Sequence, residues 1–333
     1  MKRFLCMLSV LALAGAAHAA DAPTSHYVLA HQYALGGPGH WDYLTLDTVG
    51  NRLFVTRGDR VMVVSPDSGK LLGEIQGLKH AHGVALSADG ALAYVTNGDG
   101  DDVSVVDTAT LKITDSIPVS GHDPDAIILD PASGHVLAMD GHSNSISVID
   151  PDQRKQVASI ALPGNPEFAV SDDHGHVYVN LEDISRLAEV DSKSNRLLRT
   201  WPLAPCEGPT GLAIDADHGR LFSVCANGWL IVTDAQSGRQ VAKVKIGKHP
   251  DAVAFDPTSQ QILTTAGAEG ELDVISEIDK DHFRLVAHPT TMKGARTLAL
   301  DPRNQHVYTV SAKQSARDAP VEGFTLLELE PKQ

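Results

Sequence analysis

The chain has 333 residues, of which 42% are hydrophobic and only 5% aromatic, and its formal net charge is −15. This acidic balance argues against a general nucleic-acid or anionic-membrane surface, because phosphate binding draws on an excess of Lys and Arg. The length alone would allow two domains, so the internal organisation of the chain has to decide their number.

Residues 1–19 have the pattern of a secretory signal peptide. Lys2 and Arg3 give a positive start, an apolar run follows, and the Ala-His-Ala sequence at 17–19 offers small residues for cleavage. The apolar run is too short to span a bilayer, and no other stretch is long and apolar enough. We therefore predict an exported protein of the periplasm without a membrane span, with residues 20–333 as the mature chain.

A strand without sequence neighbours comes next. Residues 26–35 read as one strand, although no partner strand precedes them. At the other end of the chain the last repeated unit has only three predicted strands, near 297–301, 306–311 and 323–330. We predict that the N-terminal strand completes this last unit, which closes the domain and removes two open sheet edges.

Between these ends the chain repeats one unit of about 40 residues. In residues 82–119, four short runs rich in β-branched and aromatic residues are separated by three turns, the pattern of a four-stranded antiparallel sheet. Each unit has an anchor five positions before the Asp or Ser that ends its first strand. The anchors are Asp42, His82, Asp125, Glu167, Thr210, Asp251 and Arg296. Their spacing of 40 to 45 residues predicts one all-β domain, a seven-bladed β-propeller with four antiparallel strands per blade.

Cys206 and Cys225 remain after the predicted cleavage and form an even pair in an oxidising compartment. Cys206 lies in the connection that enters the fifth unit, and Cys225 ends the second strand of that unit. In a propeller these two places lie on the same face. We therefore predict a disulfide between them, with two buried free thiols as the alternative.

One motif indicates a family. Tyr94-Val95-Thr96-Asn97 has weaker echoes at 53–56, 177–180 and 307–310, and Pro enters several of the units. These features resemble the YVTN-repeat β-propeller family of YncE-like exported bacterial proteins. The resemblance covers nearly the whole mature chain and implies the propeller fold. It implies no single function, because propellers serve as scaffolds, ligand binders and enzymes.

The candidate site is one mouth of the central channel. The anchors and the residues two before them are expected to converge there, because residues two apart lie on the same side of a strand. The four imidazoles among them, predicted as metal ligands, are His40, His80, His82 and His249. Crowded carboxylates favour a bound cation or bound protons, so we predict one divalent ion: Zn, Mn, Fe, Cu or Ca. The alternative is that these groups only hydrogen-bond water and backbone.

Further roles follow for residues of the same mouth. Asp125 or Glu167 would be a catalytic base, and Arg296 would hold a substrate carboxylate. We predict ligand contacts for Trp41, Asp42 and Asp251, with a wedge between blades as the alternative role of Trp41.

The sequence contains no Gly-x-Ser-x-Gly elbow, phosphate loop, zinc Cys box or haem attachment motif. We therefore predict a monomeric accessory or binding protein for a small polar ligand or a divalent metal, with an exported protein as a second kind of partner. The alternative is a metal-assisted, lactonase-like hydrolase or lyase at the same residues. The resemblance also raises nucleic-acid binding, against which the acidic charge argues.

Overall fold

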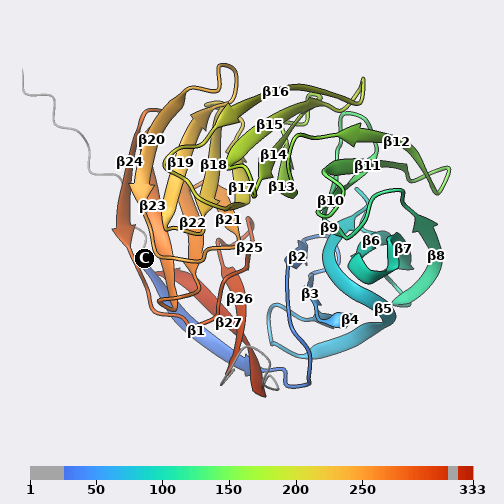
Figure 1. Cartoon of the computed structure of the whole chain (residues 1–333). Coiled ribbons are helices and arrows are strands. Elements are labelled where there is room, and N and C mark those ends of the chain that lie inside the picture. Colours follow the sequence, from blue (N-terminus) through green and yellow to red (C-terminus); the bar gives the residue numbers. More distant parts are fainter. Residues whose placement is uncertain (1–25, 314–321, 333) are drawn as a thin grey trace, which may run out of the picture.

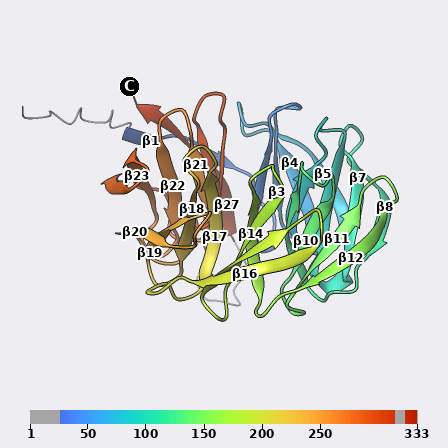
Figure 2. The same ribbon diagram turned by 90° about the horizontal axis from the view of Figure 1, so that it is seen from above.

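The computed structural model describes residues 26–313 and 322–332, so the predicted signal peptide lies outside the described part of the chain. Figure 1 shows β-sheets arranged in a ring around a central axis, and Figure 2 shows the ring edge-on. The one helix in the described residues is the short 3-10 helix η1 (Gly98–Gly100). None of the helical structure described is long and apolar enough to cross a membrane. The all-β prediction is confirmed for these residues.

Four of the six sheets contain four consecutive antiparallel strands each. In chain order these strands are β9 (Pro124–Leu129), β10 (Val136–Asp140), β11 (Ser145–Asp150), β12 (Lys155–Ala161), β13 (Pro166–Ser171), β14 (His176–Leu181), β15 (Arg186–Asp191), β16 (Arg196–Pro202), β17 (Pro209–Asp215), β18 (Arg220–Cys225), β19 (Trp229–Asp234), β20 (Gln240–Lys245), β21 (Val253–Asp256), β22 (Gln261–Ala266), β23 (Glu271–Asp279) and β24 (His282–Ala287). The first strand of each sheet lines a cavity on the central axis.

The fifth sheet joins the two ends of the chain. Its order is β1-β27-β26-β25, and its strands are β1 (His26–Ala34), β25 (Leu298–Leu300), β26 (Val307–Lys313) and β27 (Glu322–Lys332). Strand β1 runs antiparallel to β27, from the pair His26 and Lys332 to the pair Ala34 and Thr325. The predicted closure by the N-terminal strand is therefore confirmed, and β1 and β27 lie side by side in Figure 1.

The sixth sheet has seven strands. They are β2 (Leu44–Asp47), β3 (Arg52–Thr56), β4 (Gly58–Val64), β5 (Leu71–Leu86), β6 (Leu92–Asn97), β7 (Asp102–Asp107) and β8 (Lys112–Pro118). We expected seven separate sheets and find six, because the 16-residue strand β5 is continuous: its first half pairs with β4 and its second half with β6.

The predicted disulfide is present. Cys206, in the connection between β16 and β17, is bonded to Cys225 at the end of β18, with an S–S distance of 2.08 Å. Both residues are buried, with 4% and 0% of their surface exposed. The alternative of two buried free thiols is therefore wrong.

A buried carboxylate lies at the end of β10. Asp140 is fully buried, and its Oδ2 accepts hydrogen bonds from the hydroxyls of Ser145 and Ser147 at 2.7 and 2.9 Å. Its Oδ1 has no hydrogen-bond partner among the described residues. Burial raises the pKa of Asp140 to about 6, even though both serines favour the charged form. At the corresponding end of β6 the chain carries the neutral Asn97 instead.

Asp140→Asn is expected to remove one pH-dependent contribution to the free energy of unfolding. A carboxylate whose pKa is raised on folding favours the folded state when protonated, so its contribution is full below about pH 4 and is lost as the pH rises through 6. The shift corresponds to about 3 kcal/mol. Urea denaturation from pH 4 to pH 7 measures the difference between the two proteins. A difference that stays constant over this range would contradict the prediction.

Candidate functional site

A repeated irregularity shapes the mouth of the channel. In β5, Ala81 pairs with Asn97 and Val84 with Val95, so the inner strand carries one residue more than its partner. The same shift occurs between the first and second strands of three further sheets. Such β-bulges bend a strand and re-aim its side chains. The anchors at these bulges are His82, Asp125, Glu167 and Thr210.

The residues just before the inner strands break the strand geometry as well. His80, Asp123 and His249 have positive φ angles of 60°, 55° and 54°. A left-handed residue turns the chain, so the regular alternation of a strand does not apply at these positions. His80 and His82 nevertheless lie together, and Asp123 and Asp125 both lie within 3.6 Å of His82. Which side chains converge there depends on these turns and bulges.

His82 is the centre of the mouth. Its side chain is 11% exposed, and its Nδ1 lies 2.7 Å from Asp42 Oδ2. When Nδ1 of the neutral imidazole donates to this carboxylate, Nε2 is left with a free lone pair. Nε2 is buried without a hydrogen-bond partner among the described residues and lies 3.6 Å from Asp123 Oδ1. The ring of His80 is adjacent, with 4.2 Å between the two imidazole centroids.

Gly98 keeps a small space open between these groups. A Cβ built on Gly98 would lie 2.3 Å from Asp123 Oδ1 and 2.8 Å from His82 Nε2. Two ligands bound at about 2.1 Å to one tetrahedral ion are about 3.4 Å apart, close to the separation of these two atoms. His80, His82 and Asp123 can each bring one ligand atom to within 4.8 Å of the others. The geometry fits one divalent ion held by two imidazoles and a carboxylate.

The charge of His82 responds to the acids around it. Burial alone would lower its pKa, but the hydrogen bond to Asp42 and the charges of Asp42, Asp123 and Glu167 raise the pKa of His82 above the usual imidazole value. A metal ion at Nε2 would have to displace a proton from the ring.

Two acids occupy the positions in the next two sheets that His82 occupies in β5. Burial and the neighbouring carboxylates raise the pKa of Asp125 and of Glu167 well above the usual range. This direction favours the protonated acid, which suits a proton donor better than the base that we predicted. Asp125 Oδ1 lies 3.5 Å from His82 Nδ1 and has no hydrogen-bond partner among the described residues.

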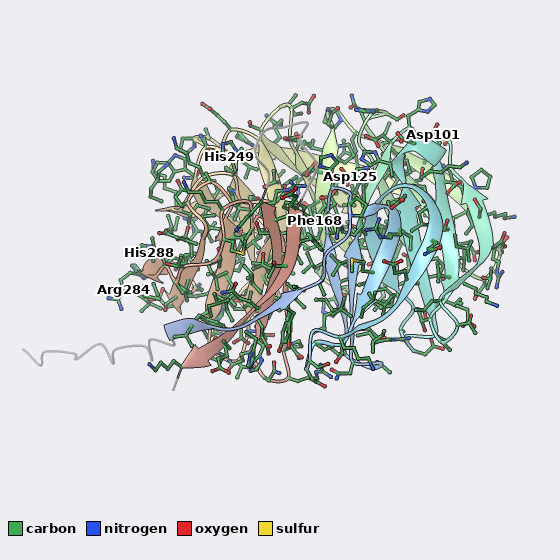
Figure 3. All side chains as sticks on the ribbon, turned by 90° about the horizontal axis from the view of Figure 1, so that it is seen from below. Asp101, Asp125, Phe168, His249, Arg284 and His288 are labelled. Atoms are coloured by element: carbon green, nitrogen blue, oxygen red, sulfur yellow. A yellow bond between two sulfur atoms is a disulfide. The ribbon has the colours of Figure 1, made fainter. Side chains whose placement is uncertain are left out.

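An aromatic pair forms the floor of the mouth. Tyr43 is 7% exposed, donates a 3.4 Å hydrogen bond to Glu167 Oε1, and packs on Phe168 with 5.4 Å between ring centroids. Both rings line the axial cavity of about 180 Å³, whose other lining residues are mostly apolar. Figure 3 shows Phe168 deeper in the ring than Asp125. The polar site is therefore confined to one end of the channel.

Arg296 is already paired. Its Nε donates to Asp251 Oδ2 at 2.6 Å, and its guanidinium donates to the carbonyl of Trp41 at 3.0 Å. A third contact, to Asp42 Oδ1, measures 3.7 Å. Since the side chain is 41% exposed, part of the guanidinium still faces solvent, but it is not a free clamp. Burial raises the pKa of Asp251 even with this partner.

Trp41 belongs to the packing between sheets. Only 7% of its surface is exposed, and its ring lies 5.6 Å from that of Phe324 in β27. This is the wedge that the sequence analysis gives as the alternative to a ligand platform. The indole leaves little surface for a ligand to stack on.

Two of the four predicted imidazole ligands stand apart from the others. His40 and His249 are exposed, and neither belongs to a group of converging ligands in the described part of the chain. Figure 3 shows His249 on the same face of the ring as Asp125 and Asp101 but well separated from them. His80 and His82 are brought together as expected. The converging group therefore contains two of the four predicted imidazoles together with Asp123.

Sequence reasoning singled out neither Gly98 nor Asp123. Asp123 belongs to the predicted mouth only because it lies two residues before the anchor Asp125, and Gly98 carries no prediction. A usable signal was that the loop after Asn97 joins a second to a third strand, on the face where the neighbouring anchors begin.

No protein-family model matches the chain. Two proteins named uncharacterized protein YncE, from Salmonella typhi and Salmonella typhimurium strain LT2, are 23% identical to it over 187 residues. The match includes 54% of this chain and 52% of each relative, so the chain spans about half the length of the relatives it matches.

Solved structures give a similar answer for the fold. Kuenenia stuttgartiensis hydrazine synthase superposes with a TM-score of 0.72 at 19% identity, over 80% of this chain and 91% of that one. A chain from a structure of the mitotic checkpoint complex superposes with a TM-score of 0.75 at 15% identity, over 97% and 98%. At such identities the likeness shows the β-propeller fold alone.

Proposed function

Since the chain is a YncE-like β-propeller with a polar channel mouth, we propose that it is an exported binding protein that holds one divalent cation at that mouth. The ligands are His80, His82 and Asp123, and Asp42 orients His82. The observation that carries the proposal is the buried, unpartnered Nε2 of His82, which faces Asp123 across the space beside Gly98. His80 is half exposed, so coordination positions remain open to water or to a small polar ligand.

Variants of the mouth are expected to distinguish the residues that bind the ion from those that do not. His82→Ala removes the central ligand, and Gly98→Ala fills the ion's space and pushes Asp123 Oδ1 and His82 Nε2 apart without removing any ligand side chain; each is expected to abolish Zn²⁺ binding at the mouth. Asp42→Asn is expected to weaken it by about 10-fold to 100-fold. Binding should tighten as the pH rises through the raised pKa of His82, because a proton is displaced.

Isothermal titration calorimetry and elemental analysis of untagged protein measure these changes, with Zn²⁺, Mn²⁺ and Fe²⁺ as probes. His249→Ala is the matched control, because this exposed histidine lies on the same face and is not a ligand in the proposal. If His82→Ala and Gly98→Ala bind as many ions as the unaltered protein, the proposal is wrong.

A second function, metal-assisted hydrolysis or elimination, is favoured by one observation. The pKa of Asp125 is raised by desolvation and by neighbouring carboxylates, and its Oδ1 lies 3.5 Å from His82 Nδ1. It could donate a proton to a leaving group near an ion that polarises a carbonyl. Asp125→Asn is then expected to keep the ion and to lose turnover of lactone or ester substrates by at least about 100-fold. Equal turnover in both proteins would favour the binding function.

We infer seven blades from the packing. Phe54, Val61 and Val63 of the first half of the seven-stranded sheet share one apolar cluster with Val84 and Val95 of the second half. Two halves that face each other across a core are two blades joined by the continuous strand β5. Together with the five four-stranded sheets they make seven, with residues 20–333 as one domain.

Export to the periplasm is part of the proposal. The signal-peptide pattern of residues 1–19 and the disulfide between Cys206 and Cys225 support it, since disulfides persist in oxidising compartments. The proposed partners are the ion, a small polar ligand that completes its coordination, and an exported protein. The chain is proposed to act as a monomer.

A further inference from the structure

A second group of converging ligands lies on the face of the ring opposite the mouth. Strand β17 starts at the mouth and ends on the far face at Asp215, and the turn that follows carries His218. Glu277 reaches the same point from β23 of the neighbouring sheet. The group therefore bridges two sheets that are otherwise joined by apolar packing.

The three side chains meet closely. His218 Nδ1 lies 2.6 Å from Asp215 Oδ2 and 3.0 Å from Glu277 Oε1. The two carboxylate side chains are 3% and 0% exposed, whereas the imidazole is 40% exposed. One nitrogen thus faces two buried carboxylates, with solvent on the outer side of the ring.

The carboxylates of Asp215 and Glu277 have fewer hydrogen-bond donors than their oxygens can accept. Glu277 Oε2 is buried and has no hydrogen-bond partner among the described residues. Asp215 Oδ2 is buried as well, and it shares the N–H of His218 Nδ1 with Glu277 Oε1. One N–H cannot donate well to two oxygens at once, and buried charges need close partners. The arrangement leaves negative charge turned toward one point, where a dication would compensate it.

The guanidinium of Arg220 lies nearby, and its hydrogen-bond donors are already bound to other groups. Its donors bind the carbonyls of His218, Gly219 and Lys280 and the carboxylates of Asp234 and Asp281. The contacts to residues 280 and 281 tie the same two sheets together beside the three-residue group. Arg220 therefore shapes the interface but donates no hydrogen bond to Asp215 or Glu277.

We propose that Asp215, His218 and Glu277 hold a second divalent cation, which links the β17–β20 sheet to the β21–β24 sheet. One imidazole and two carboxylates are suitable ligands for Zn²⁺ or Mn²⁺, and the exposed side of His218 leaves room for water as a further ligand. The ion binds the folded ring and not the separated strands, so it stabilises the fold. This site is independent of the ion proposed at the mouth.

The test uses the untagged Gly98→Ala protein, in which the mouth is blocked. Zn²⁺ is expected to bind it with a stoichiometry of one and, at about 100 times the dissociation constant, to raise the Tm by about 5 °C. His218→Ala added to this protein is expected to abolish both the bound ion and the rise in Tm. His282→Ala, which removes an exposed histidine from the adjacent hairpin, is the control and is expected to change neither.

The proposal is overturned if the Gly98→Ala protein binds no Zn²⁺ or Mn²⁺, or if adding His218→Ala leaves the ion and the rise in Tm in place. If the His218→Ala protein does not fold, Glu277→Gln takes its place in the experiment, with the same expected results. The experiments can refute either of the two proposed sites without refuting the other. Failure at the mouth shows as an unchanged ion count in Gly98→Ala, and failure here as an unchanged count in His218→Ala.

Discussion

A chain that begins at Leu35 is expected to lose the cooperative unfolding transition of the full-length protein. The truncation removes β1 and leaves the backbone of β27 unpaired over the length of their ladder. It also removes Tyr27, which is 3% exposed and donates a hydrogen bond to the carbonyl of Gln305 at 3.0 Å. Because β1 connects the N-terminal end of the ring to its last sheet, its loss weakens the whole domain and leaves β27 as an aggregation-prone edge.

Circular dichroism melts and size-exclusion chromatography measure the loss. A chain that begins at His26 keeps β1 and serves as the control, with an expected Tm equal to that of the full-length chain. A peptide of residues 26–34 added to the truncated chain is expected to restore the transition in part, by strand addition to β27. The same Tm in the truncated and control chains would show that closure by β1 contributes no stability.

Replacing Arg57 by Met is expected to destabilise the protein by about 4 kcal/mol. Arg57 is fully buried, and it forms no ion pair with any of the described residues. Its guanidinium lies over the ring of Phe324 at 3.6 Å from the centroid. Burial lowers the pKa of Arg57 to about 10, which leaves it charged at neutral pH. A buried cation of this kind depends on its hydrogen bonds.

The hydrogen bonds from Arg57 to backbone carbonyls all go to the connection between β1 and β2. The guanidinium donates to the carbonyls of residues 36 to 40, at distances from 2.9 to 3.3 Å. This segment links the closing strand β1 to Trp41 and Asp42 at the mouth. Met has a similar length but no donors, so the five backbone carbonyls would lose their hydrogen bonds from Arg57, although that of Pro38 keeps its hydrogen bond from Arg60. The variant therefore tests both the closure and the position of the mouth.

Urea denaturation measures the stability of the Arg57→Met protein. Arg57→Lys is expected to recover less than half of the loss, because an ammonium has three donors and no planar face for Phe324. Arg60→Ala is the matched control: Arg60 binds the carbonyl of Pro38 in the same segment but does so in an exposed contact, so its loss is expected to cost under about 1 kcal/mol. Equal losses for Arg57→Met and Arg60→Ala would contradict this account.

The local predictions that held depend on periodicity and on compartment. The YVTN-type motifs and the 40-residue spacing predicted antiparallel β-units and the YncE-like propeller, because each unit has the same short-range pattern of strands and turns. The incomplete last unit predicted the pairing of β1 with β27. The disulfide followed from an even cysteine count and from two places expected on one face.

The predictions that were wrong concern contacts that the repeat pattern does not determine. Strand β5 runs through a turn that the repeat predicted, so six sheets are found where seven were expected. The bulges and left-handed residues of the mouth interrupt the regular strand geometry from which the site was predicted. His40 and His249 are exposed and belong to no converging group in the described part of the chain, and Arg296 is paired with Asp251.

The sequence by itself determined which residue types stand at the start of each inner strand, because that position recurs with the repeat. Only the tertiary structure decided that His82, Asp123 and the open space at Gly98 meet, since Gly98 follows His82 by 16 residues in the same unit and Asp123 belongs to the next unit, 41 residues after His82. Distances of a few ångströms between such units depend on bulges, turns and the close approach of one sheet to the next, and none of these has a periodic signature.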